Sequence, residues 1–190
     1  MRIISGTLRG KKIHLPEDKK TRPLRDLVKE SIFNLINHSS KFDFDIINTN
    51  ILDCFSGSGS FGLECLSRGA LEVTFVENYS LAIEILKKNI NNLKLNRQSN
   101  YYQKKILDYL NDENHINNNF DLIFLDPPYK ELNTNHIIEK VEKLNILKEN
   151  GLIVMHRHRK NNLDISQKLK ILDTRTYGIS KIIIGSLSSN

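Results

Sequence analysis

Short apolar runs alternate with segments of helical periodicity along most of the chain. A run of about four to eight apolar residues bounded by turn residues is typical of a buried strand, and apolar residues spaced three and four apart are typical of an amphipathic helix. This alternation predicts an α/β fold with a doubly wound, mostly parallel sheet that binds ligands at the carboxyl ends of its strands. The predicted strands are 51–52, 73–77, 101–104, 121–125, 152–155, 171–172 and 182–184.

The first helix is predicted to begin at Pro23, because proline is well tolerated at a first helical position and apolar residues then recur with helical spacing. Its packed face is predicted to include Leu27. The side chains of Arg25, Lys29 and Glu30 are expected to face solvent.

Two further helix boundaries are predicted from single residues. Ser80 is predicted to cap the helix that runs to Asn92, since a serine hydroxyl can accept a hydrogen bond from an N–H of the first turn. The helix 135–147 is predicted to close at Asn150-Gly151, a pair typical of helix C-termini. A short helix is expected around Leu107.

A glycine-rich turn follows the first predicted strand. Gly57, Gly59 and Gly62 match a G-x-G-x-x-G fingerprint, in which glycines let the backbone turn sharply and approach a ligand at a helix N-terminus. Glu77 ends the next predicted strand, eighteen residues after Gly59, where a carboxylate can accept hydrogen bonds from both hydroxyls of a ribose. The combination predicts a nucleoside-containing cofactor, the alternative being a structural strand-turn-helix corner without a ligand.

Positive charge is concentrated near the N-terminus. The net formal charge is +6, and residues 1–30 alone hold nine Lys and Arg against four acids, a balance of +5. Two short alternating runs flank a turn with Arg9 at its tip, which predicts a β-hairpin. Such a basic patch is typical of a surface that neutralises phosphates, the alternative being a solvated cationic face. The residues predicted to contact nucleic acid are Arg2, Arg9, Lys11, Lys12, Arg22 and Arg25.

Length and composition favour one fold with a small appendage. A chain of 190 residues can bury a core that needs neither a disulfide nor a metal. Cys54 and Cys65 are expected to be reduced core residues. The N-terminus has no apolar leader pattern, and no run approaches the roughly 20 apolar residues of a membrane span. We therefore expect a cytoplasmic protein with neither a membrane partner nor a bound metal.

The sequence Asp126-Pro127-Pro128-Tyr129 follows the near-continuous apolar run 121–125. It is therefore expected at the carboxyl edge of the sheet, beside the glycine turn. Consecutive prolines fix the backbone and remove two N–H donors, so the Asp126 carboxylate and the Pro127 carbonyl form an acceptor-rich edge suited to an –NH₂ group. Tyr129 offers a ring on which a flipped-out base can stack. The alternative is a rigid loop whose aspartate caps a turn.

These motifs together resemble those of the class I S-adenosylmethionine-dependent amino-methyltransferases. Within that class the chain is similar to the RsmD family, the bacterial methyltransferases that modify guanine N2 in 16S ribosomal RNA. The N-terminal basic motifs discriminate this family from its relatives, which share the other motifs. The resemblance spans positions 2–129, and the matching segments are 2–12, 22–34, 52–64 and 126–129.

The resemblance implies a fold, a cofactor and a partner. The fold is a seven-stranded Rossmann-like methyltransferase sheet over residues 41–190, preceded by a basic RNA-docking hairpin and helix over residues 1–40. The partner is ribosomal RNA, either free or within an assembling small ribosomal subunit. The cofactor is S-adenosylmethionine, and the residues implied to bind it are Asp53, Phe55, Gly57, Gly59, Glu77 and Ile106.

The resemblance also implies roles for individual residues. Asp53 would reach the amino group of the cofactor, Glu77 its ribose, and the backbone of Ile106 its adenine. The catalytic group is implied to be Asp126, Pro127, Pro128 and Tyr129. Hydrogen bonds from the target amine to the Asp126 carboxylate and the Pro127 carbonyl would favour a pyramidal nitrogen whose lone pair faces the methyl group.

Two features depart from the family pattern. Leu24, Arg25 and Leu27 stand where the family often has two threonines and an arginine, so no role is carried over to these side chains. The strand 152–155 usually ends in an acid, but here it runs into the basic segment 156–160. We interpret that segment as a solvated loop, the alternative being a phosphate contact beside the active site.

Three rival hypotheses use parts of the same pattern. An NAD-dependent oxidoreductase would share the glycines and Glu77, but the segment 126–129 has no role in it and no hydride-transfer residues are evident. A DNA adenine-N6 or cytosine-N4 methyltransferase would use the same acceptor edge, but the chain has no long target-recognition insertion. A non-catalytic RNA-binding module would retain the fold, and the intact Asp126 and Tyr129 argue against it.

Overall fold

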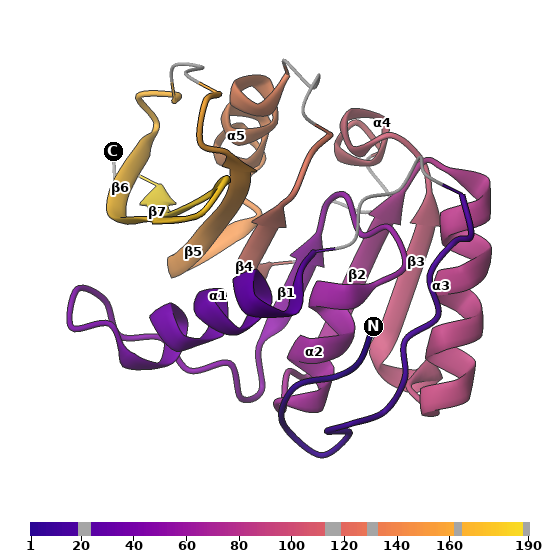
Figure 1. Ribbon diagram of the computed structural model, residues 1–190. Coiled ribbons are helices and arrows are strands. Elements are labelled where there is room, and N and C mark those ends of the chain that lie inside the picture. The colour runs from indigo at the N-terminus through magenta and orange to yellow at the C-terminus, as the bar shows by residue number, and fades with distance from the viewer. Residues whose placement is uncertain (19–23, 113–118, 129–132, 162–164, 188–190) are drawn as a thin grey trace.

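A seven-stranded sheet forms the centre of the computed structural model, which describes residues 1–18, 24–112, 119–128, 133–161 and 165–187 (Figure 1). The strand order is β3-β2-β1-β4-β5-β7-β6. The first five strands are parallel, and the last two form an antiparallel hairpin at one edge. The predicted doubly wound, mostly parallel sheet is therefore confirmed. The strands are β1 (Asn50–Asp53), β2 (Glu72–Glu77), β3 (Ser99–Gln103), β4 (Phe120–Leu125), β5 (Leu147–His158), β6 (Leu169–Tyr177) and β7 (Ser180–Leu187).

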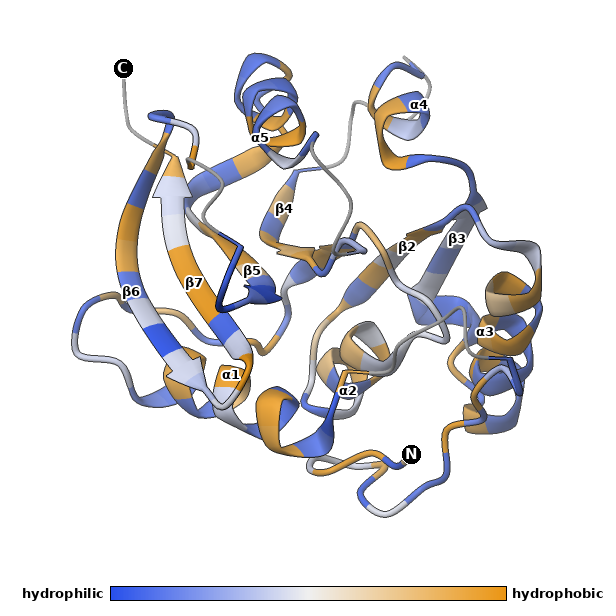
Figure 2. Cartoon of the chain, turned by 45° about the horizontal axis from the view of Figure 1, so that its top comes forward, coloured by the Kyte–Doolittle hydropathy of each residue, from blue (hydrophilic) through white to orange (hydrophobic). Residues whose placement is uncertain are grey.

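Helices cover both faces of this sheet (Figure 1). Because successive strand residues point to opposite faces, each central strand supplies both layers. Ile51 packs in the core on the side of the first three helices, and its neighbour Leu52 packs in the core beneath the other two. The helices are α1 (Asp26–His38), α2 (Ser60–Ser67), α3 (Ser80–Leu93), α4 (Ile106–Leu110) and α5 (Thr134–Lys143). Figure 2 shows apolar residues on the central strands and polar residues along the outer side of α5.

Helix α1 differs from its predicted orientation at two positions. The helix begins at Asp26, and its buried stripe is centred on Val28 and Ile32, so that Leu27 is 68% exposed. Lys29, expected in solvent, is fully buried. Its ammonium group donates to the Arg2 carbonyl at 3.0 Å. The apolar spacing identified the helix but not which side of it faces the core.

The buried Lys29 side chain is compensated by an ion pair that the sequence pattern did not predict. Its ammonium nitrogen lies 3.4 Å from the carboxylate of Glu64, which is also fully buried, on helix α2. Burial lowers the pKa of Lys29, and the neighbouring Glu64 carboxylate opposes that shift. A buried charge of this kind requires a partner, and Glu64 supplies it.

The N-terminal segment forms a short antiparallel pairing, as predicted, that docks on helix α2. Arg2 pairs with Lys12 in an isolated bridge, so the predicted hairpin is present but too short for regular strands. The Glu64 carboxylate accepts hydrogen bonds from the N–H groups of Ile4 and Ser5 at 2.8 and 2.9 Å. Ile3 belongs to the same core cluster as the sheet. The division at residue 40 into a docking extension and a methyltransferase domain stays a prediction.

Two predicted helix boundaries are wrong. Tyr79, not Ser80, is the N-cap of α3. Helix α5 ends at Lys143, and Asn145 just beyond it adopts the left-handed conformation with φ of +50°. The segment Asn150-Gly151 lies inside β5 instead of closing the helix. Several asparagines in this region can leave the helical conformation, and the pattern did not show which one ends the helix.

The described part of the chain contains no helix with the length and apolar character needed to cross a membrane. Cys54 and Cys65 are both buried and free, as predicted.

Candidate active site

The turn between β1 and α2 leaves its backbone open on one side. Gly57 and Gly59 have φ values of +54° and +87°, a region that favours glycine. A Cβ atom added to Gly57 would meet nothing within 4 Å. A Cβ atom added to Gly62 would lie 2.3 Å from the ring of Phe75, so this glycine lets α2 pack closely on β2. Gly57 therefore leaves the turn open to a ligand, and Gly62 allows close packing of the helix on the sheet.

Asp53 lies buried beneath this turn, at the end of β1. One carboxylate oxygen, Oδ2, accepts a hydrogen bond from the N–H of Gly62 at 3.1 Å. The other, Oδ1, is buried and has no hydrogen-bond partner among the described residues. Burial raises the pKa of Asp53 to about 8; the Gly62 N–H opposes this rise, and the carboxylates of Asp126 and Glu77 add to it. The bare oxygen suits a cationic or hydrogen-bond-donating group of a ligand.

Glu77 connects the end of β2 to the glycine turn. Its Oε2 atom accepts a hydrogen bond from the Gly57 N–H at 2.8 Å, and its Oε1 atom accepts one from the Tyr79 N–H at 2.8 Å. Each carboxylate oxygen has two lone pairs, so both can still accept a hydroxyl. The predicted contact with a ribose is compatible with this geometry and stays a prediction.

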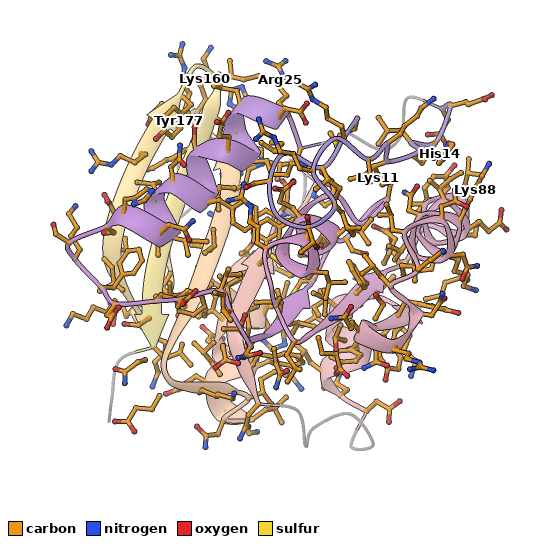
Figure 3. All side chains as sticks on the ribbon, turned by 90° about the horizontal axis from the view of Figure 1, so that it is seen from below. Lys11, His14, Arg25, Lys88, Lys160 and Tyr177 are labelled. Carbon is orange, nitrogen blue, oxygen red and sulfur yellow. The ribbon has the colours of Figure 1, made fainter. Side chains whose placement is uncertain are left out.

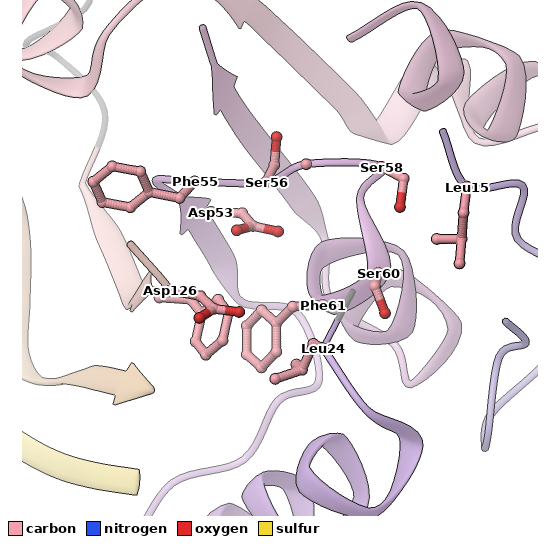
Figure 4. Close-up of a pocket in the computed structure, with 11 residues that line it drawn as sticks. Leu15, Leu24, Asp53, Phe55, Ser56, Ser58, Ser60, Phe61 and Asp126 are labelled. Carbon is pink, nitrogen blue, oxygen red and sulfur yellow. The ribbon is translucent and has the colours of Figure 1, made fainter. Parts of the chain in front are cut away.

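Asp126 lies at the same sheet edge as Asp53. The two strands are neighbours and Asp53 pairs with Phe124, so β4 carries Asp126 just past the end of β1. A pocket is lined by both aspartates together with Phe55 and Gly57 (Figure 4). The three carboxylates of Asp53, Glu77 and Asp126 therefore gather where the central strands end. Such a position is the usual ligand site of an open α/β sheet.

The other residues of the predicted catalytic group are less completely described. Pro127 is half-buried and Pro128 is exposed, directly after Asp126. Tyr129 lies outside the described residues, so its stacking role stays a prediction. Neither proline can donate a backbone hydrogen bond to the Asp126 carboxylate.

A second cavity of about 380 Å³ adjoins the first, because Phe55 lines both. Glu77 and Ile106 lie along its wall, and Ile106 is the first residue of α4. Among the predicted cofactor residues, Asp53 and Gly57 thus line one cavity and Glu77 and Ile106 line the other. Gly59 lies behind the turn, where an added Cβ atom would meet Leu86 instead of a ligand.

His156 is a site residue that the sequence interpretation missed. Strand β5 continues to His158, so residues 156–158 belong to a strand and not to the solvated loop expected over 156–160, whereas Arg159 and Lys160 are exposed in a turn as expected. The His156 side chain is 4% exposed, and its Nδ1 atom lies 2.8 Å from Oδ1 of Asp126. Its Nε2 atom lies 2.9 Å from the Ser180 hydroxyl of β7. The register of β5 against β4 could have revealed this contact. Met155 pairs with Leu125, so the residues that follow them, His156 and Asp126, are neighbours.

The predicted RNA-binding side chains lie at two places on the surface. Arg2, Arg9, Lys11 and Lys12 are exposed along the N-terminal pairing, and Arg25 is exposed at the start of α1. Figure 3 shows Lys11 and Arg25 on the same side of the molecule, some way apart. Arg22 lies outside the described residues. RNA binding by this set stays a prediction, and the described residues contain no group of side chains that could hold a metal ion.

Comparison with known proteins confirms the resemblance. A family model described as Conserved hypothetical protein 95 matches residues 1–186. Ribosomal RNA small subunit methyltransferase D of Haemophilus influenzae is 34% identical over 180 residues, which cover 94% of this chain and 90% of the relative. The solved structure of yhhF from Escherichia coli has a TM-score of 0.85 at 25% identity and covers 100% of this chain and 99% of its own.

A more distant solved structure shares the fold alone. SMU.776, a protein complexed with SAH, has a TM-score of 0.64 at 19% identity, and the match covers 83% of this chain and 48% of that chain. The family match extends over nearly the whole chain and includes both the N-terminal basic segment and the carboxylate-lined edge of the sheet. The chain therefore belongs to the Conserved hypothetical protein 95 family, the family of ribosomal RNA small subunit methyltransferase D.

Proposed function

We propose that the protein transfers a methyl group from S-adenosylmethionine to the N2 amine of a guanine in small-subunit ribosomal RNA. The observation that carries this proposal is the single pocket in which Asp53, from below the glycine turn, meets Asp126 of the acceptor edge. Asp53 suits a cofactor cation, and Asp126 suits a substrate amine. The Haemophilus relative is named for a small-subunit ribosomal RNA.

The chemistry of the pocket fits S-adenosylmethionine better than NAD. Among the described residues, those that line it include Asp53 and Asp126 and no basic side chain. The Asp126 carboxylate would repel the pyrophosphate of NAD and attract an ammonium or sulfonium cation, and a cation beside Asp53 would favour the ionised form of that group. The buried Oδ1 of Asp53, which has no partner in the described part of the chain, is placed to accept an ammonium hydrogen bond. SMU.776, which shares the fold, was found with SAH.

The protein's own residues would act on the target amine. Asp126 and the Pro127 carbonyl accept the two N–H groups of the amine, which weakens its conjugation with the ring and directs its lone pair into the pocket. Bound S-adenosylmethionine supplies an activated methyl group. Since that group needs no further activation, the contribution of Asp126 is orientation and electrostatic stabilisation of a nitrogen that gains positive charge.

The product of the purified protein tests the proposal. The protein is incubated with isotopically labelled S-adenosylmethionine and with 16S ribosomal RNA, deproteinised or in small subunits, from cells that lack the gene. We expect N2-methylguanosine after nuclease digestion and mass spectrometry, and none with Asp126→Ala. Label in N6-methyladenosine or N4-methylcytosine, or transfer to DNA in preference to RNA, would reject the proposed substrate.

A further inference from the structure

The Asp126 carboxylate is held by a side-chain pair from two other strands. His156 contributes its Nδ1 atom at 2.8 Å, and Ser180 contacts the far side of the imidazole at 2.9 Å. Both His156 and Ser180 are buried, whereas the Asp126 side chain is 23% exposed. The buried imidazole of His156 is thus hydrogen-bonded at both ring nitrogens, and it lies behind the Asp126 carboxylate, which borders the pocket.

The hydrogen-bonding capacity of these groups determines the direction of each bond. A carboxylate can only accept, so Nδ1 of His156 carries the hydrogen and donates it to Asp126. On the far side of the ring, Nε2 accepts from the Ser180 hydroxyl when the ring is neutral and donates to the Ser180 oxygen when the ring is protonated, so Ser180 holds the ring in both forms. Because Pro127 and Pro128 have no N–H, the residues directly after Asp126 cannot replace this donor.

We propose that His156, fixed by Ser180, positions Asp126 so that the second carboxylate oxygen faces the target amine. His156 is a positioning residue, because it acts through Asp126 and not on the substrate. The inference rests on the proposed function. Without the imidazole, the Asp126 side chain would rotate freely at the pocket edge, and a misplacement of about 1 Å can lower turnover roughly 100-fold.

Two amide substitutions separate positioning from packing. The side-chain nitrogen of Asn can occupy the place of the imidazole Nδ1, whereas that of Gln reaches the place of Nε2. We expect His156→Asn to retain most of the turnover number and His156→Gln to lower it about 10- to 100-fold. The KM for S-adenosylmethionine and the melting temperature should be similar in the two variants, which serve as each other's control.

The hydrogen bond itself can be observed without an activity assay. In nitrogen-15 NMR spectra, the Nδ1–H signal of His156 should be protected from exchange in the wild type and lose that protection in Asp126→Ala. If the wild type is active and His156→Gln is equally active, the positioning role is overturned. An inactive wild type with a protected Nδ1–H signal would reject the proposed function instead.

A second, independent observation is an apolar groove at the same sheet edge. It has a volume of about 440 Å³ and lies between the start of α1 and the turn from β6 to β7. Leu27 on one side is 68% exposed and Ile179 on the other is 39% exposed. Its lining residues are Arg25, Leu27, Val28, Tyr177, Gly178, Ile179 and Ser180.

This groove is connected to Asp126 through Ser180 and His156. Strand β7 runs antiparallel to β5, and Ser180 pairs with His158, so the turn before Ser180 lies at the carboxyl end of β5. Ser180 lines the groove and also contacts His156, the partner of Asp126. When the target base of a nucleic acid enters the Asp126 pocket, the adjacent nucleotide would therefore lie beside this groove.

One cationic side chain lines the groove and two more lie near it. Arg25 lines it, and the exposed Arg159 donates its backbone N–H to the Ile179 carbonyl at 2.8 Å. Figure 3 shows Arg25, Lys160 and Tyr177 at one corner of the molecule. Of the nearby acids on α1, Asp26 lies 4.0 Å from the Lys29 ammonium and Glu30 is exposed. The combination of apolar floor and basic rim is complementary to an unpaired base and its phosphate.

We infer that this groove seats a single-stranded ribosomal RNA nucleotide next to the target guanosine. Leu27, Tyr177 and Ile179 would contact the base, while Arg25 and Lys160 would contact phosphate. This inference also rests on the proposed function. It assigns the exposed Leu27 of α1 a contact with the RNA base.

A pair of leucine variants tests the groove. Leu27→Ser removes apolar surface from it, and Leu71→Ser is the matched control, since Leu71 is 54% exposed just before the amino end of β2. We expect Leu27→Ser to weaken binding of deproteinised 16S ribosomal RNA about 5- to 20-fold, with unchanged affinity for S-adenosylmethionine. Leu71→Ser should bind as the wild type does.

The outcomes distinguish the occupant. Equal RNA affinity for the two leucine variants would overturn the groove as an RNA site. A loss that appears with assembled subunits and not with deproteinised RNA would identify a ribosomal protein as the occupant and would also overturn it. Selective weakening by Leu27→Ser, together with a product other than N2-methylguanosine, would support the groove and reject the proposed function.

Discussion

At the scale of single residues, Asp53 shows how burial prepares a group for a ligand. Its carboxyl group is enclosed beneath the glycine turn with one oxygen unpartnered among the described residues, and burial raises its pKa to about 8. In the ligand-free protein at neutral pH the group is therefore mainly protonated. A ligand ammonium beside it would favour the carboxylate and lower the pKa.

This environment predicts that cofactor binding releases a proton. At pH 6 the free Asp53 holds a proton that the ammonium contact displaces, so affinity for S-adenosylmethionine should rise as pH increases from 6 toward 8. Isothermal titration calorimetry at pH 6, in two buffers of different ionisation enthalpy, should show release of close to one proton. Asp53→Asn should release none. Proton-neutral binding by the wild type would contradict the Asp53 contact.

Glu77 has a structural role as well as its predicted ligand role. We expect Glu77→Ala to weaken S-adenosylmethionine binding roughly 10- to 150-fold, because it removes a charge-assisted contact of about 1.5–3 kcal/mol and frees the Gly57 N–H. Glu72→Ala, at the other end of β2, is the control and should bind normally. Calorimetry in which NAD binds more tightly than S-adenosylmethionine would contradict the cofactor assignment.

At the scale of elements, a buried ion pair connects the N-terminal segment to the sheet. Glu64 on α2 pairs with Lys29 of α1, accepts two backbone N–H groups of the N-terminal segment and receives a third bond from Arg68 at 2.9 Å. Elements far apart in sequence therefore depend on one carboxylate. A sequence pattern could not reveal this, because Lys29 and Glu64 look like ordinary surface charges on two helices.

Removal of the Glu64 carboxylate should lower the stability of the protein more than removal of the Lys29 ammonium group. Glu64→Ala leaves a buried ammonium without its carboxylate partner and two backbone donors unpaired, which should lower the free energy of unfolding by about 3–5 kcal/mol. Lys29→Met keeps the apolar stem and leaves Glu64 with its backbone donors and Arg68, so its cost should be smaller. Chemical denaturation measures both values. A larger loss in Lys29→Met would contradict this ranking.

The N-terminal basic side chains give a prediction about salt dependence. Arg9→Ala combined with Lys11→Ala and Lys12→Ala removes exposed cations and leaves the cofactor cavities intact. The triple variant should bind RNA more weakly, and the slope of log affinity against log salt should fall by about 0.7–0.9 per lost phosphate contact. S-adenosylmethionine affinity is the control. Parallel salt plots for wild type and variant would show that these residues form only a solvated cationic face.

At the scale of the whole molecule, local periodicity and motif spacing predicted the sheet, the glycine turn, and Glu77 and Asp126 at the edge beside it, and the family resemblance added Asp53. Those features follow from local pattern and from the rule that parallel strands end at one edge. His156 was missed because its role depends on the register of β5 beside β4 and β7. Leu27 was assigned to the core because a helical period does not fix which side of α1 faces inward.

The central claim is methylation of guanine N2 in small-subunit ribosomal RNA. Its most direct test is a map of modified nucleotides in ribosomal RNA from cells with the gene, without it, and with only the Asp126→Ala form. We predict one N2-methylguanosine in 16S RNA that is present with the wild-type gene and absent in the other two strains. Identical maps in all three strains, or the loss of a methyl group on adenine or cytosine, would contradict the account.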